Sequence, residues 1–290
     1  MTISCSPPHR SVPLAVNRRH TYDGAETEFV TNPFGRISAA SKVGPVTSPA
    51  SPGTRTDART TTPSTVWALV RGATAALLTA AIVTQLSTTI ANTLASPTPH
   101  GGHLPTVIAN FFSYFTILSN VSAVVAFALG AAWLWGRGRD GRTEPAWLGV
   151  LLACVATYMI TTGIVYNVLL RSVSVGVTQP WVNEVLHVVG PAVLLLDVLF
   201  APGRRRLPWS TLAAIAAFPI VWAVYTLLRA NLVVAPATGN PWWYPYPFLD
   251  PHLVPGGYLG VAGYIVGIAA AILLLGAGVI AVSRRRGADG

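Results

Sequence analysis

The sequence predicts an all-α, polytopic membrane protein, folded as a bundle of six transmembrane helices. Composition is the first observation behind this prediction: 52% of the 290 residues are hydrophobic and 10% are charged, against about 45–50% and about 25% in soluble domains. The second is a set of six apolar stretches, each close to the ~20 residues needed to cross ~30 Å of hydrocarbon. The third is the gathering of basic residues in short runs between those stretches. Lipid is therefore expected to be the main solvent of this chain.

Each apolar stretch is interpreted as one helix, because backbone groups in lipid must be hydrogen-bonded within their own segment. The short alternating segments of an outer-membrane barrel are not visible in the sequence. A six-helix transmembrane domain is predicted at residues 66–283, followed by a basic cytoplasmic C-terminus at 284–290. The predicted helices cover residues 66–92, 108–135, 147–170, 181–202, 208–229 and 256–283.

Residues 1–65 differ from the rest of the chain, since they are rich in Ser, Thr, Pro and Arg and have no apolar periodicity. Such a segment cannot bury enough surface to offset the entropy of folding, so a disordered cytoplasmic tail is predicted. No apolar core of a signal peptide follows the first positive charges, so an ordinary cleavable signal is not expected. A wrongly chosen translation start is the alternative explanation for this segment.

The distribution of basic residues predicts the orientation in the membrane. Seventeen of the 19 lie on one side of the six helices: in the tail, at the beginning of the first helix (Arg71), in the loops of that side or after the last helix. Arg171 and Arg229 lie at the opposite ends of the third and fifth helices. Basic residues near helix ends are retained on the cytoplasmic side. Both termini are therefore predicted to be cytoplasmic, in a plasma membrane. Lys42 is the only lysine against eighteen arginines, a bias that suggests a bacterial source.

Several other classes of protein are not expected. The charges are too scattered to form one nucleic-acid-binding face. Cys5 and Cys154 support neither a disulfide framework nor a zinc site, and His100 and His103 lack a nearby third ligand for a metal. Dinucleotide-binding, Walker A, HExxH and G-x-S-x-G patterns are absent from the sequence, so neither a metal nor a cofactor is predicted.

Polar side chains within the predicted helices are the candidates for function, because they are costly in lipid unless they have partners. In the segment 181–187, Asn183, Glu184 and His187 are spaced so as to share about one face of a helix. Glu184 could then orient the imidazole. Asp197 lies ten residues further on and is expected to meet the basic run at 204–206.

A second polar stripe is predicted in the helix over residues 108–135, where it must face protein or a wet cavity. Thr116 is eight residues into this helix and His187 is six residues into its own, which gives similar depths of ~12 Å and ~9 Å. We expect one pocket that opens towards the outer leaflet and collects both stripes. The stripe consists of Asn110, Ser113, Thr116 and Asn120, and the same level holds Tyr166, Asn167, Gln85 and Thr88.

The loop at residues 241–251 combines aromatic residues with several prolines. Trp243, Tyr244 and Tyr246 are its candidate site residues, because a proline-stiffened loop can form a lid over the pocket. The alternative is an aromatic belt at the membrane interface. In a similar way, Thr116 can simply bond the carbonyl four residues before it, and His187 can have a structural hydrogen-bonding role.

Three of these elements carry a resemblance to a known family. Phe115-Thr116, then Trp181-x-Asn183-x-x-x-His187 with Asp197, and then the run from Trp243 to Asp250 resemble the androgen-induced-gene family of six-helix membrane proteins. The resemblance covers residues 66–283 and is strongest to prokaryotic relatives of unassigned function. Animal members are threonine hydrolases that cleave esters of fatty acids with hydroxy fatty acids. The resemblance implies Thr116 as nucleophile and His187 as base, with Ser113 and Ser119 as competing nucleophiles.

The chemistry of the residues agrees with this implication in outline. A threonine hydroxyl is a weak nucleophile that needs an adjacent base, and histidine suits that role near neutral pH. Asn183 or Asn120 is expected to supply a hydrogen-bond donor to the oxyanion. The expected function is hydrolysis of a membrane lipid ester. The alternative is a non-enzymatic six-helix protein, either a regulatory or scaffolding component or a small transporter, although no internal repeat typical of transporters is visible.

Overall fold

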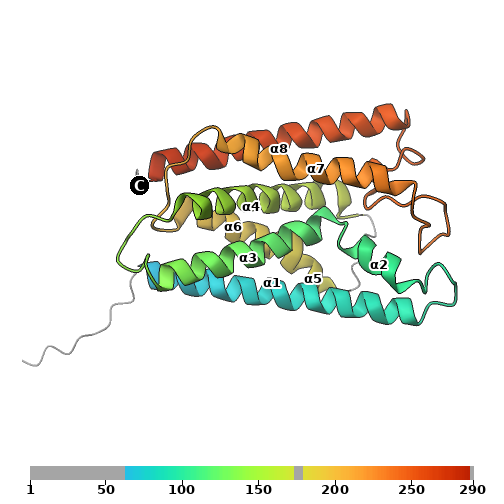
Figure 1. Cartoon of the computed structure of the whole chain (residues 1–290), viewed down its shortest axis with the longest axis horizontal. Coiled ribbons are helices and arrows are strands. Elements are labelled where there is room, and N and C mark those ends of the chain that lie inside the picture. The colour runs from blue at the N-terminus through green and yellow to red at the C-terminus, as the bar shows by residue number, and fades with distance from the viewer. Residues whose placement is uncertain (1–62, 173–178, 288–290) are drawn as a thin grey trace, which may run out of the picture. The chain divides into compact units, whose positions relative to one another are not determined.

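In a computed structural model of the chain, the described residues are 63–172 and 179–287 (Figure 1). The predicted disordered tail lies outside these residues except for its last three positions. Those three begin helix α1, which starts at Pro63, so the predicted boundary at residue 66 was wrong by one turn of helix. Proline is well suited to the first turn, where its missing N–H would have no partner within the helix.

Six helices of the described part are long and apolar enough to cross a membrane, with mean hydropathies of 1.7 to 2.8. Every regular element described there is helical, which confirms the predicted all-α, six-span fold. The spans are α1 (Pro63–Leu94), α3 (Phe115–Trp135), α4 (Ala146–Val165) with the π-helical turn η1 (Tyr166–Leu170), α5 (Pro180–Glu184) with the π-helical turn η2 (Val185–Val189) and α6 (Gly190–Phe200), α7 (Thr211–Ala230), and α8 (Tyr258–Arg286).

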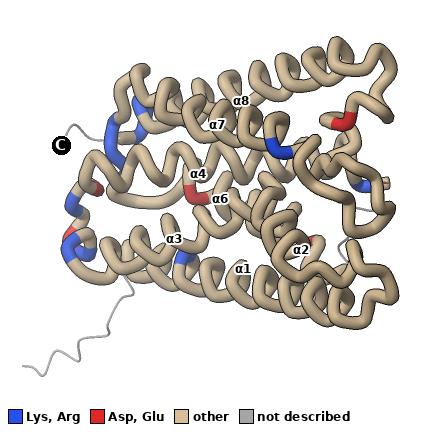
Figure 2. Tube along the Cα trace, turned by 45° about the vertical axis from the view of Figure 1, so that its right-hand side comes forward, with Lys and Arg blue, Asp and Glu red and all other residues tan. Residues whose placement is uncertain are grey.

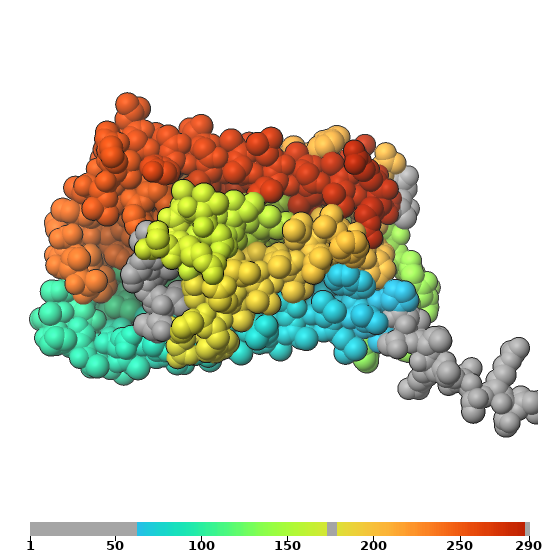
Figure 3. Space-filling model, turned by 180° about the vertical axis from the view of Figure 1, so that it is seen from behind, coloured from blue at the N-terminus to red at the C-terminus, as the bar shows by residue number. Residues whose placement is uncertain are grey.

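Helix α4 is the central element of the bundle. It packs against α3, α6 and α8, and 67% of its span is buried, against 17% for α7 and 22% for α8. Figure 1 shows α4 between the pair α7 and α8 and the pair α1 and α3, and Figure 3 shows α6 on the opposite side, between α1 and α8. Leu148, Leu152 and Met159 of α4 are fully buried in the core. The outer helices instead expose apolar side chains, as expected of a surface that faces lipid.

Two glycines allow the central helices to approach closely. A Cβ at Gly163 would lie 2.9 Å from the Pro191 ring, and one at Gly190 would lie 2.9 Å from Cε of Met159. Small residues serve this purpose in membrane helices.

The predicted helix over residues 108–135 is broken in the structure. Helix α2 (Leu104–Phe111) ends before the break, and helix α3 begins after it, at Phe115. Ser113 in the break is held by α7, because Trp222 Nε1 donates to its carbonyl at 2.9 Å and its hydroxyl lies 3.0 Å from that of Tyr225. Thr116 therefore lies in the first turn of α3, and the expectation that it is eight residues into a continuous helix was wrong.

Charged residues collect at the end of the bundle where α8 ends, called the basic end here (Figure 2). Asp197 lies 3.5 Å from Arg204, as expected, but its closest partner is Arg71 of α1, at 2.7 Å. Arg71 and Asp197 are 0% and 1% exposed. The sequence interpretation had counted Arg71 as a flanking cytoplasmic charge, whereas it is buried in an ion pair between α1 and α6.

Candidate functional site

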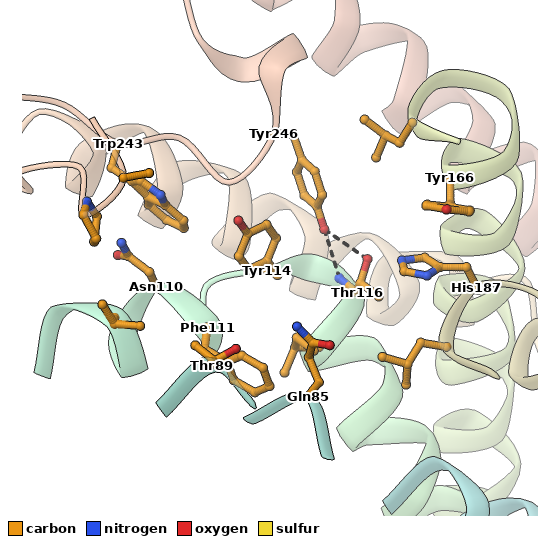
Figure 4. Close-up of a pocket in the computed structure, with 16 residues that line it drawn as sticks. Gln85, Thr89, Asn110, Phe111, Tyr114, Thr116, Tyr166, His187, Trp243 and Tyr246 are labelled. Atoms are coloured by element: carbon orange, nitrogen blue, oxygen red, sulfur yellow. Dashed lines mark hydrogen bonds between the residues drawn. The ribbon is translucent and has the colours of Figure 1, made fainter. Parts of the chain in front are cut away.

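A cavity of about 230 Å³ lies at the opposite end of the bundle, called the loop end here (Figure 4). It is large enough to hold several waters or part of an acyl chain. Its walls come from α1, α2, the start of α3, both π-helical turns, and the loop that follows α7. The lining residues are Gln85, Thr89, Val107, Asn110, Phe111, Tyr114, Thr116, Ile117, Tyr166, Leu170, Leu186, His187, Pro236, Ala237, Trp243 and Tyr246.

Thr116 contributes its hydroxyl to this cavity from the first turn of α3. Its N–H is one of the backbone donors that have no partner within a helix. The Tyr246 hydroxyl accepts this N–H at 3.1 Å and lies 3.2 Å from Thr116 Oγ1. Because the phenol already accepts one hydrogen bond, it is free to donate its own hydrogen to Oγ1.

Tyr246 stays neutral in this arrangement, because burial raises the pKa of its phenol above the ordinary value of 10.0. Other buried threonines behave differently from Thr116: Thr157 and Thr161 each donate to the carbonyl four residues before them, at 2.8 Å. Thr116 makes no such bond within the described part of the chain. When the Tyr246 hydroxyl is the donor of the pair, the hydroxyl hydrogen of Thr116 is available to a base in the cavity.

His187 lies in the middle of η2 and is 4% exposed. Its Nδ1 is 3.0 Å from the carbonyl oxygen of Asn183. A carbonyl only accepts, so Nδ1 carries the hydrogen in the neutral ring and Nε2 carries the lone pair. The Tyr166 ring stacks on the imidazole, with 4.0 Å between ring centroids and 24° between planes. The tautomer and the plane of the ring are therefore both set by neighbours.

The backbone around His187 is shaped by a proline. Pro191 has no N–H to give to the preceding turn, and that turn is π-helical. Asn120 donates to the carbonyl of Leu186 at 3.3 Å, and Asn167 donates to the carbonyl of His187 at 3.4 Å. These two amides satisfy the backbone acceptors that would otherwise lack donors.

Thr116 and His187 line the same cavity, and Figure 4 shows the imidazole extending from its helix towards Thr116. No hydrogen bond joins their side chains in the described residues. Catalytic hydrogen bonds are often long without substrate, and one water can complete such a pair. The arrangement offers a hydroxyl, a basic nitrogen and a neutral phenol donor around one space.

The structure separates the remaining predicted site residues into two groups. Tyr166, Trp243 and Tyr246 line the cavity, whereas Asn167 and Tyr244 do not. The three residues that were predicted to support the chemistry do not line the cavity either; they are Asn120, Asn183 and Glu184.

Each of the three has another partner. Glu184 pairs with Arg171 at 3.0 Å on the exposed surface, so it does not orient the imidazole. Asn183 donates its amide to the Tyr166 hydroxyl, and Asn120 donates to backbone carbonyls. Neither amide lines the cavity, and the hydroxyl of Tyr246 is the polar group that lies beside Thr116.

Sequence reasoning missed two features of the cavity wall. Tyr114 contacts Trp243 and Tyr246 edge to face, and burial raises the pKa of its phenol to about 12. Asn110 accepts a hydrogen bond from Arg229 at 2.7 Å. The polar stripe that contains Asn110 was a signal for the second feature, but its partner on α7 could not be identified from spacing.

The fold and the cavity define a class: a multi-pass helical membrane protein with a buried, partly polar cavity at one end. Comparisons with family models, curated proteins and solved structures found no match for the chain. The described residues contain no group of three His, Cys, Asp or Glu side chains that could hold a metal ion.

Proposed function

We propose that the protein is a membrane lipid ester hydrolase in which Thr116 is the nucleophile and His187 is the base. One observation carries the proposal: both side chains reach one cavity, where Nε2 of His187 has no hydrogen-bond partner among the described residues and the Thr116 hydroxyl is bonded only to the hydroxyl of Tyr246 there. The resemblance of the motifs around these residues to the androgen-induced-gene family supports the same assignment.

The proposed reaction has two halves. Nε2 of His187 takes the hydroxyl proton while Thr116 Oγ1 attacks the ester carbonyl, and the Tyr246 hydroxyl donates to the developing oxyanion. The alcohol leaves with the proton from His187, which gives an acyl-threonine. A water then gives its proton to His187 and attacks the acyl carbon, and the acid leaves as Thr116 regains its hydrogen.

The walls of the cavity support a lipid as the substrate. Ile117, Phe111, Leu170 and Leu186 surround the reactive groups with apolar surface. Such a lining favours an acyl chain, because removing apolar area from water contributes about 25 cal/mol per Å².

The test compares Thr116→Ala, His187→Ala and the double variant by hydrolysis of a panel of lipid esters and by labelling with a fluorophosphonate probe. A nucleophile and its base act as a unit, so all three variants should lose roughly the same activity, on the order of 10³-fold or more. Ser113→Ala and Ser119→Ala are the matched controls and should retain labelling. Ester hydrolysis that persists in Thr116→Ala would remove the threonine from the mechanism. A parent protein that neither labels nor hydrolyses any ester would favour the non-enzymatic alternative.

A further inference from the structure

Arg229 lies at the loop end of α7 and differs from three other arginines of the described residues. Arg71, Arg171 and Arg204 each pair with a carboxylate. No Asp or Glu of the described residues lies within ion-pair distance of Arg229, which is half-buried. Its guanidinium donates one hydrogen bond, to Oδ1 of Asn110 at 2.7 Å, and lies 5.5 Å from the centre of the Trp243 ring.

These contacts leave most of the binding capacity of Arg229 unused. A guanidinium has five N–H donors in a planar fork, and one of them is occupied. The C-terminus of α7 and the face of Trp243 stabilise the positive charge in part. A partly desolvated cation without a counter-ion is still unfavourable, so the local structure is suited to receive an anion.

Asn110 provides a second unused donor at the same place. The residue is 5% exposed and lines the cavity, and its Nδ2 is buried without a hydrogen-bond partner in the described structure. Its Oδ1 already accepts from Arg229, so the unpartnered atom of this amide is the donor Nδ2. Two neighbouring groups with unused donors match a carboxylate or a phosphate.

The surrounding backbone holds this pair in place. The N–H of Trp243 donates to the carbonyl of Ala230 at 2.9 Å, so the loop folds back on the end of α7 beside Arg229. Figure 4 shows Asn110 and Trp243 at one end of the cavity, with Thr116 and His187 at the other. Arg229 does not itself line the cavity, but it contacts two residues that do, Asn110 and Trp243, so the cavity extends from the neighbours of Arg229 to the candidate reactive groups.

We propose that Arg229 and Asn110 form an anion subsite, which binds the carboxylate or phosphate of an acyl lipid whose chain occupies the cavity. The proposal that the ester of that lipid lies at Thr116 rests on the proposed function. Binding of the anionic group does not depend on the proposed function, and it is tested with probes that contain no ester.

The experiment uses the full-length protein in a neutral detergent and measures binding of oleate, oleyl phosphate, oleyl alcohol and inorganic phosphate by calorimetry. The parent should bind the two anionic chains roughly tenfold or more tightly than oleyl alcohol, as expected for hydrogen bonds to a charged group. Arg229→Gln should lose this preference and keep its affinity for oleyl alcohol. Arg171→Gln is the matched control: it removes an equal charge at the same end of the bundle and should bind like the parent.

A second variant guards against a loss of folding in Arg229→Gln. Asn110→Asp is nearly isosteric and places a carboxylate beside Arg229, so it should stay folded and lose the preference for anionic chains. A parent preference for oleate over oleyl phosphate assigns the subsite to carboxylates, and the reverse order assigns it to phosphates.

Three results would overturn the proposal: equal affinity of the parent for oleate and oleyl alcohol, an unchanged preference in both variants, or inorganic phosphate binding as tightly as oleyl phosphate. Labelling at Thr116 without selective anion binding would defeat the subsite alone. Anion binding without any hydrolysis would defeat the proposed function alone.

Discussion

The hydroxyl of Thr116 depends on a contact from 130 residues further along the chain. Tyr246 accepts the N–H of Thr116 and lies within hydrogen-bond distance of its Oγ1. Sequence reasoning selected both residues, Thr116 as a polar group in an apolar helix and Tyr246 as part of a lid. Their contact could not be predicted, because nothing in either segment indicates which loop covers the start of α3.

Tyr246→Phe tests the role of this hydroxyl. The variant leaves the N–H of Thr116 without its acceptor, which should lower stability by about 1–3 kcal/mol. If the phenol also donates to the oxyanion, ester hydrolysis should fall by roughly 10²–10³-fold. Tyr244→Phe is the control, since the Tyr244 hydroxyl lies outside the cavity and 3.5 Å from that of Tyr258. Full activity of Tyr246→Phe at an unchanged melting temperature would show that the contact has neither role.

At the scale of elements, the six spans and the all-α class were predictable because length and hydropathy determine them. The break before α3 was not predictable, because the residues around Ser113 include no Pro or Gly. The break is instead stabilised by Trp222 and Tyr225 of α7. The π-helical turn η2 was also missed. The face predicted for Asn183, Glu184 and His187 assumed α-helical spacing, which changes where the turn widens.

Asn120 connects the two elements that carry the reactive groups. Its Nδ2 donates to the carbonyl of Thr116 at 2.8 Å and to that of Leu186 in η2 at 3.3 Å. Asn120→Leu, a substitution of similar size, should therefore lower the free energy of unfolding by about 1–3 kcal/mol and reduce hydrolysis as well. Ser122→Ala is the control on the same helix, because Ser122 bonds only to its own helix at Leu118. Equal melting temperatures of the two variants would contradict a linking role for Asn120.

At the scale of the whole molecule, the two ends of the bundle have different interactions. The loop end holds the cavity, and the basic end is joined by buried ion pairs. Arg71 reaches Asp197 of α6 with two hydrogen bonds and the carbonyl of Gly130 in α3 with a third. A Cβ at position 130 would lie 2.7 Å from Nη1 of Arg71, so a side chain there would displace the guanidinium. Three spans are thus connected through one side chain.

Asp197→Leu should destabilise the protein by about 3–5 kcal/mol, because Arg71 would remain buried without its counter-ion. The double variant Arg71→Met with Asp197→Leu should recover most of that loss, since the partners are then removed together. Arg204 keeps a carboxylate in both variants, as Glu144 lies 3.8 Å from it. The measurement is the thermal unfolding midpoint in detergent, and a double variant less stable than Asp197→Leu would show that the pair itself is strongly favourable.

The asymmetry of charge between the two ends predicts the orientation in the membrane. Excluding the buried Arg71 leaves sixteen basic residues on the predicted cytoplasmic side against Arg171 and Arg229 on the other. A basic residue near an anionic leaflet contributes about 1 kcal/mol, so the bias strongly favours a cytoplasmic basic end. Alkaline phosphatase, active only outside the cytoplasm, should be inactive when fused after Gly290 and active when fused after Gly239 in the loop that follows α7. The opposite pattern would reverse the topology and place the mouth of the cavity in the cytoplasm, where its substrate would have to come from the inner leaflet.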